Sequence, residues 1–126
     1  MITEDYVSFE TAKLLKEKGF DESTIMRYDS NGEISSDGRY GHYNSLKKFD
    51  FISAPTLQMA MKWLREVHNL EIYPSHDNFQ EHHSWWFDIY KFSKGYSGIP
   101  YESNSIYPTY EEACEAAIRY CLENLI

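Results

Sequence analysis

The sequence predicts an α+β fold: a single domain in which one twisted antiparallel sheet is covered by helices. Three segments with apolar residues at helical spacing alternate with pairs of strand-like segments, in the order α-β-β-α-β-β(-β)-α. The 126 residues, of which 42% are hydrophobic, are enough for one compact domain and few for two. We therefore treat residues 1–126 as one α+β domain.

The helices are marked by their caps and apolar stripes. The first is expected over about residues 9–18, after the N-cap Ser8 and before a glycine that suits a left-handed C-terminal position. The second is expected over about residues 53–69, with a proline in its first turn, and is apolar over more than half its circumference. The third starts at a capping box of Thr109 and Glu112 and runs to the C-terminus.

The first pair of strands is predicted as a hairpin over residues 24–34. Asn31 and Gly32 would form its turn, both with positive φ. A continuation over residues 39–43 is open, because a polar stretch precedes it. The second pair covers residues 70–73 and 85–92.

A polar segment, residues 74–84, joins the second pair and is expected to be a loop and the most mobile part of the chain. A further extended piece around residues 99–107 leads into the third helix.

Charge and hydropathy exclude several classes of protein. With 20 Asp and Glu against 12 Lys and Arg, the formal net charge is -8, which disfavours binding to a phosphate backbone. No apolar stretch approaches the ~20 residues of a membrane span, and the N-terminal segment lacks the pattern of a signal peptide. We expect a cytoplasmic protein with no nucleic-acid or membrane partner.

The two cysteines, Cys114 and Cys121, fall in the third helix. Seven helical residues rise about 10.5 Å, which is beyond the ~7 Å Cα separation that a disulfide tolerates. We expect two free thiols on the apolar side of the helix.

The segment 85–92 is the richest in aromatic side chains. On a strand, Trp86, Asp88 and Tyr90 share one face and the intervening apolar residues share the other. Both faces are then apolar, so both are covered, one of them by a helix or a second subunit. Alternatively, Trp86 and Tyr90 form a stacking surface with Asp88 as acceptor, and Tyr96 and Tyr101 close over it.

A nucleotide-like ligand would also require cations. The candidates near the strands are Arg27, Arg39 and Lys91. Because both faces of the aromatic strand are apolar, we expect a homodimer or a higher homo-oligomer.

No metal or other cofactor is expected. His76, His82 and His83 lie close in sequence, but their spacing is not that of a ligand pair on a helix or strand. Motifs for phosphate loops, serine hydrolases and zinc proteases are also missing. We therefore expect a binding protein rather than an enzyme.

Residues 54–69 and 110–126 resemble segments of small uncharacterised proteins from phages and integrated mobile elements of Bacteroides-type gut bacteria, and residues 2–20 are similar too. That group has no assigned catalytic residues to carry over. The resemblance implies an accessory protein that acts in the cytoplasm of a bacterial host cell and counteracts host defence.

Together these observations favour a non-enzymatic accessory protein that binds a host protein or a small signalling molecule. One alternative is an oligomeric nucleotide sponge with an aromatic pocket. The other is a small-molecule hydrolase, in which Asp88 would be the general base.

Overall fold

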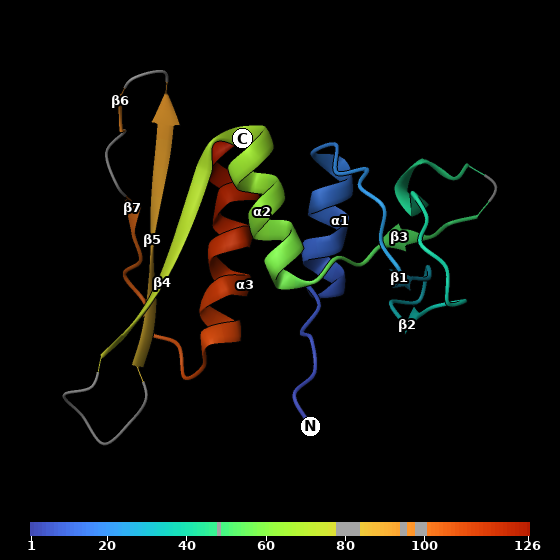
Figure 1. The fold of residues 1–126 in the computed structure, drawn as a ribbon, viewed down its shortest axis with the longest axis horizontal. Coiled ribbons are helices and arrows are strands. Elements are labelled where there is room, and N and C mark those ends of the chain that lie inside the picture. Colours follow the sequence, from blue (N-terminus) through green and yellow to red (C-terminus); the bar gives the residue numbers. More distant parts are fainter. Residues whose placement is uncertain (48, 78–83, 94–95, 98–100) are drawn as a thin grey trace. The chain divides into compact units, whose positions relative to one another are not determined.

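The computed structural model describes residues 1–47, 49–77, 84–93, 96–97 and 101–126 (Figure 1). Helices and antiparallel strands follow one another along the chain, which confirms the α+β class. The strands form two sheets, where the sequence predicted one. The chain divides into two compact units, residues 1–59 and 60–126, and the single-domain assignment stays a prediction.

The N-terminal unit combines one helix with a three-stranded sheet of order β2-β1-β3. The Ser8 side chain caps the helix as predicted, accepting a hydrogen bond from the Thr11 N–H at 3.2 Å. The buried hydroxyl of Tyr28 donates a hydrogen bond to the Val7 carbonyl at 2.6 Å, which connects β1 to the segment before α1. The elements are α1 (Phe9–Glu17), β1 (Arg27–Tyr28), β2 (Ile34–Ser35), the 3-10 helix η1 (Tyr43–Ser45) and β3 (Ile52–Ser53).

The predicted hairpin forms, with a different turn. The Gly32 N–H donates to the Asp29 carbonyl at 3.0 Å, and the Asp29 carboxylate accepts from the N–H groups of Asn31 and Glu33 at 2.8 and 3.0 Å. Gly32 has a φ of 82°, whereas Asn31 does not adopt a positive φ. The Asp29 side chain therefore favours a type I turn followed by a left-handed glycine, instead of two residues with positive φ.

The predicted continuation of this hairpin does not form a strand of the sheet. In the predicted arm 39–43, Gly41 makes an isolated bridge with Thr24, and a 3-10 turn begins at Tyr43.

The C-terminal unit contains most of α2 and the larger sheet. The Thr56 hydroxyl accepts from the Met59 N–H at 3.1 Å, so α2 begins after Thr56, slightly later than predicted. Asn69, with a φ of 58°, follows the last helical residue. The elements are α2 (Leu57–His68), β4 (Leu70–Asp77), β5 (Ser84–Ser93), β6 (Tyr96–Ser97), β7 (Tyr101–Glu102), α3 (Tyr110–Tyr120) and the π-helical turn η2 (Cys121–Leu125).

β4 and β5 form a long antiparallel ladder, from Leu70 opposite Lys91 to Asp77 opposite Ser84. In the expected loop 74–84, residues 74–77 and 84 are therefore strand. The remaining residues, 78–83, lie outside the described part of the chain, so the predicted mobility stays a prediction. β6 and β7 both pair with β5.

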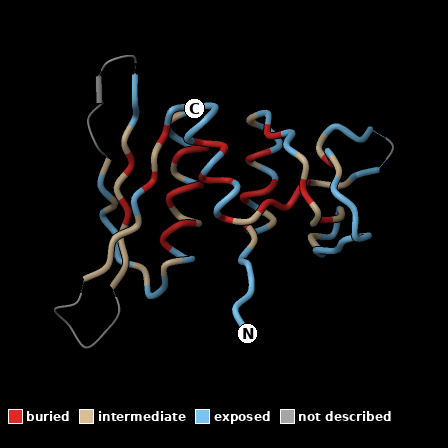
Figure 2. Tube along the Cα trace, viewed as in Figure 1, coloured by how far each residue is buried: buried red, intermediate tan, exposed pale blue. Residues whose placement is uncertain are grey.

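The core of the C-terminal unit lies between the sheet and α3 (Figure 2). The Thr109 hydroxyl accepts from the Glu112 N–H at 3.1 Å, as the capping box predicts. Cys114 and Cys121 are free and fully buried, also as predicted. Burial raises their pKa to about 11 and about 12. No helix among the described residues is long and apolar enough to cross a membrane.

Candidate functional site

The two sides of β5 have opposite surroundings. Phe87 and Ile89 are 3% and 1% exposed and face α3. Trp86, Asp88 and Tyr90 alternate with them and are partly exposed. In Figure 1, no described helix of this unit lies on that second side of the sheet.

We call this second side the outer face. The strand register places on it residues Glu71, Tyr73, Ser75, Asp77, Ser84, Trp86, Asp88, Tyr90, Phe92 and Glu102. The prediction that Trp86, Asp88 and Tyr90 share one face is confirmed. Tyr73, 46% exposed, meets Tyr90 edge-on, with ring centroids 5.2 Å apart.

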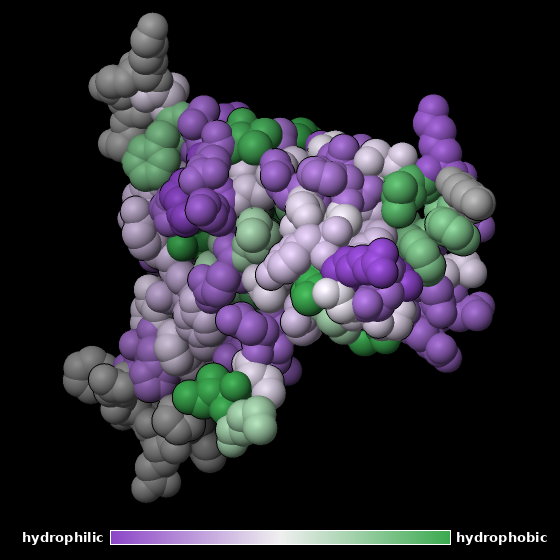
Figure 3. Space-filling view, turned by 45° about the vertical axis from the view of Figure 1, so that its right-hand side comes forward, coloured by the Kyte–Doolittle hydropathy of each residue, from purple (hydrophilic) through white to green (hydrophobic). Residues whose placement is uncertain are grey.

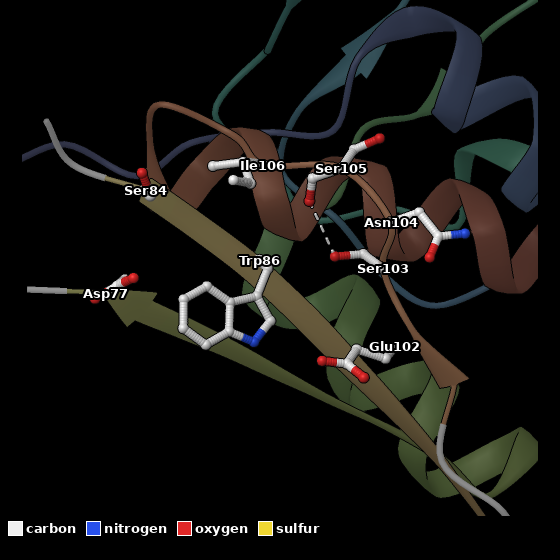
Figure 4. Close-up of a pocket in the computed structure, with 8 residues that line it drawn as sticks. All are labelled: Asp77, Ser84, Trp86, Glu102, Ser103, Asn104, Ser105 and Ile106. Carbon is white, nitrogen blue, oxygen red and sulfur yellow. Dashed lines mark hydrogen bonds between the residues drawn. The ribbon is translucent and has the colours of Figure 1, made fainter. Parts of the chain in front are cut away.

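The outer face contains two hollows. The first is a shallow depression of about 440 Å³ lined by Tyr73, Asp88, Tyr90 and Phe92. The second, of about 270 Å³, is lined by Asp77, Ser84, Trp86 and residues 102–106 (Figure 4). In Figure 4 the indole of Trp86 lies between the carboxylates of Asp77 and Glu102. We call this second space the Trp86 hollow.

A bulge opposite Trp86 creates the hollow. The Ser103 N–H donates to the Phe87 carbonyl at 2.9 Å, and Trp85 and Tyr107 exchange two backbone hydrogen bonds of 2.8 and 2.7 Å. Between these pairs β5 has one residue, Trp86, while the facing chain has residues 104–106. Such a bulge interrupts the ladder and opens space beside the strand.

The bulge satisfies its own polar groups. The Ser103 hydroxyl accepts from the Phe87 N–H at 3.2 Å and donates to the Ser105 carbonyl at 3.2 Å. These bonds link the turn that forms the wall of the hollow to β5.

The outer face is acidic. Asp88 lies directly opposite Glu102 on the neighbouring strand. The ion pairs within the described part of the chain include neither of them, whereas Glu71 is paired with Arg65 at 3.4 Å. Rings and carboxylates thus share one surface.

Of the two tyrosines predicted to close over this surface, Tyr101 lies elsewhere. Tyr101 pairs with Ile89 and stacks on Tyr120, with ring centroids 3.8 Å apart, so it belongs to the helix-covered face and that prediction is wrong. Burial and the neighbouring Tyr120 hydroxyl raise the pKa of Tyr101. Tyr96, in β6, pairs with Ser93 of β5, and the side chain of Tyr96 lies outside the described part.

Of the predicted cations, Lys91 does not lie on the outer face, and Arg27 and Arg39 belong to the other unit. Lys91 lies opposite Leu70, at a position of β5 that alternates with Trp86, Asp88 and Tyr90 and therefore belongs to the other face. Arg27 belongs to the N-terminal unit, where its guanidinium lies 4.1 Å from the ring of Phe51 and 3.5 Å from Asp37. Arg39 is exposed in the same unit. Strand alternation therefore corrects the expectation for Lys91, which lies on the opposite side of β5 from Trp86 and Tyr90.

No group of three potential metal ligands occurs among the described residues. His76 packs against Trp85, with ring centroids 4.8 Å apart, while His82 and His83 lie outside the described part.

Sequence reasoning missed the acidic and serine-rich wall of the hollow, contributed by Glu102 and residues 103–106. Ser103 and Asn104 are ordinary turn residues, and only long-range pairing places them beside Trp86. The chain matches no protein-family model, no curated protein and no solved structure. The function is therefore argued from the geometry of this face.

Proposed function

We propose that this chain is a non-catalytic, cytoplasmic binding protein that captures a basic protein partner on its outer face. The observation that carries the proposal is the alternation of rings with carboxylates: Trp86 and Tyr90 flank Asp88, and Glu102 faces Asp88 from the next strand. Aromatic residues are enriched at protein interfaces, and complementary charge steers and selects the partner.

A protein partner suits this face better than a nucleotide. Phosphate recognition requires cations or converging N–H groups, whereas the described charges beside Trp86 and Tyr90 are carboxylates. Figure 3 shows one side of the molecule, on which hydrophobic residues form small groups among hydrophilic ones. On the outer face, the rings of Trp86 and Tyr90 lie beside Asp88 and Glu102. A polar and aromatic surface of this kind is typical of contacts between separately folded proteins.

A second copy of this chain is a poorer occupant of the outer face. A two-fold contact places the same patch on both subunits, so Asp88 and Glu102 of one copy would meet acidic residues of the other. The expected homo-oligomer, if it forms, would use another surface. In the phage or mobile-element context, the partner is a host protein and its capture counteracts host defence.

Capture from a bacterial lysate tests the proposal. The immobilised protein is compared with the double variant Trp86→Ala/Tyr90→Ala and with the control Tyr40→Ala, which removes a ring that is 73% exposed in the N-terminal unit. The captured protein is identified and purified, and its Kd is measured. Because buried aromatic anchors contribute about 2 kcal/mol or more, we expect the double variant to lose at least ~30-fold in affinity.

The alternatives give different results. Raised melting temperatures with a panel of nucleotides, abolished in the double variant, would instead support the nucleotide sponge. A captured acidic protein that binds the double variant equally well would contradict the proposed surface.

A further inference from the structure

The Trp86 hollow has the size of a receptor for one side chain. Its volume of about 270 Å³ is below the ~300–1,000 Å³ that is usual for small-molecule sites. An aromatic wall, Trp86, stands between two carboxylates, those of Asp77 and Glu102 (Figure 4). A ring flanked by carboxylates attracts a cation through its π face and through direct ion pairing.

Charge repulsion at the edge of the hollow also favours a cationic occupant. Asp88 and Glu102 occupy directly opposed positions on β5 and β7. Like charges placed opposite each other destabilise a sheet. A cation bound beside Glu102 would remove this repulsion, so binding would stabilise the strand pair.

The same chain already uses this combination for one of its own arginines. The guanidinium of Arg27 lies 4.1 Å from the ring of Phe51, 5.0 Å from that of Tyr43 and 3.5 Å from the carboxylate of Asp37. In the N-terminal unit, therefore, rings and a carboxylate surround a guanidinium. The Trp86 hollow offers a ring and the carboxylate of Glu102, and the described residues that line it include no cation.

We infer that the Trp86 hollow binds the guanidinium of an arginine side chain of the partner, stacked on the indole and paired with Glu102. This inference rests on the proposed function. Arginine fits better than lysine because its planar group can stack on an aromatic face and at the same time present several donors to a neighbouring carboxylate. The small volume selects one extended side chain.

A short peptide tests the inference without knowledge of the partner. The probe is acetyl-Gly-Ser-Arg-Ser-Gly-amide, and its counterparts carry citrulline, which is neutral and nearly isosteric, or lysine. The three tryptophans give three indole N–H signals in a nitrogen-proton NMR spectrum, and Trp86→Phe identifies the signal of Trp86. We expect the arginine peptide to shift the Trp86 signal with a millimolar Kd, the lysine peptide to bind several-fold more weakly, and the citrulline peptide to leave the signal unmoved.

The charge requirement has a matched control. Glu102→Gln should weaken binding of the arginine peptide about 10-fold, which is the usual contribution of a hydrogen bond to a charged group. Glu66→Gln removes the same charge from an exposed position of α2 and should change nothing.

Three results would overturn the inference: equal binding of the citrulline peptide, no effect of Glu102→Gln, or a shift of the Trp86 signal by calcium but not by the arginine peptide. If the arginine peptide fails while partner capture still depends on Trp86 and Tyr90, only this inference is wrong. If capture is also independent of those rings, the proposed function is wrong as well.

Discussion

The two faces of β5 have similar compositions and different surroundings. On the inner face Phe87 stacks near Tyr107, with ring centroids 6.0 Å apart, and lies beneath α3. On the outer face Trp86 and Tyr90 alternate with Asp88 and remain partly exposed. The comparison teaches that aromatic content alone does not distinguish a buried face of a strand from a partly exposed one. A carboxylate between two rings does, because an unpaired charge is costly inside a core.

The inner rings also have more partners. Trp85 meets Tyr110 of α3 edge-on at 5.3 Å, and Tyr101 stacks on Tyr120 of the same helix at 3.8 Å. Each of these pairs joins the sheet to the helix. The ring pair Tyr73–Tyr90 joins only neighbouring strands. Loss of an inner ring should therefore loosen the fold, whereas loss of an outer ring should not.

The largest expected effect is on stability. Phe87→Ala should lower the free energy of unfolding by about 3–5 kcal/mol, the range for a buried phenylalanine. Tyr90→Ala, on the same strand, is the matched control and should cost less than about 1 kcal/mol. Urea unfolding followed by circular dichroism measures both. Equal losses would mean that the two faces are equally part of the core.

The pH dependence of stability tests whether the thiols of Cys114 and Cys121 are shielded from water. The ordinary thiol pKa is 9.0, and burial raises it to about 11 for Cys114 and about 12 for Cys121. Between the unfolded and folded values the folded chain binds more protons, so its stability falls as pH rises above about 9, by up to ~1.4 kcal/mol per pH unit for each thiol. Urea unfolding at pH 7, 9 and 10 should show this fall. The variant Cys114→Ala/Cys121→Ala should show a smaller one, and identical slopes would refute buried thiols.

A smaller effect should appear on the outer face. Glu102→Gln removes the charge opposite Asp88 and should raise the free energy of unfolding by about 0.2–1 kcal/mol. Glu66→Gln controls for the change in net charge. Thermal unfolding at low salt measures both variants, and a loss of stability in Glu102→Gln would show that this carboxylate is already compensated.

Local patterns in the sequence predict much of this arrangement. The caps Ser8 and Thr109 begin their helices as expected, since a cap depends on neighbours a few residues away. The shared face of Trp86, Asp88 and Tyr90 follows from the two-residue period of a strand.

Long-range pairing explains what the sequence does not predict. Pro74 was interpreted as the start of a loop, but β4 is an edge strand, so the missing N–H removes no bond from the ladder. The position of Tyr101 against Tyr120 and the bulge at residues 104–106 depend on where β7 pairs with β5. Neither the register nor the extra residues has a local signal.

The most direct test of the central claim measures stability and binding on one variant, Trp86→Ala/Tyr90→Ala. If the outer face serves recognition, the free energy of unfolding should stay within about 1 kcal/mol of the parent value, and affinity for the captured partner should fall by at least ~30-fold. A loss of about 3 kcal/mol or more would place these rings in a core. Unchanged affinity in a folded variant would equally contradict the account.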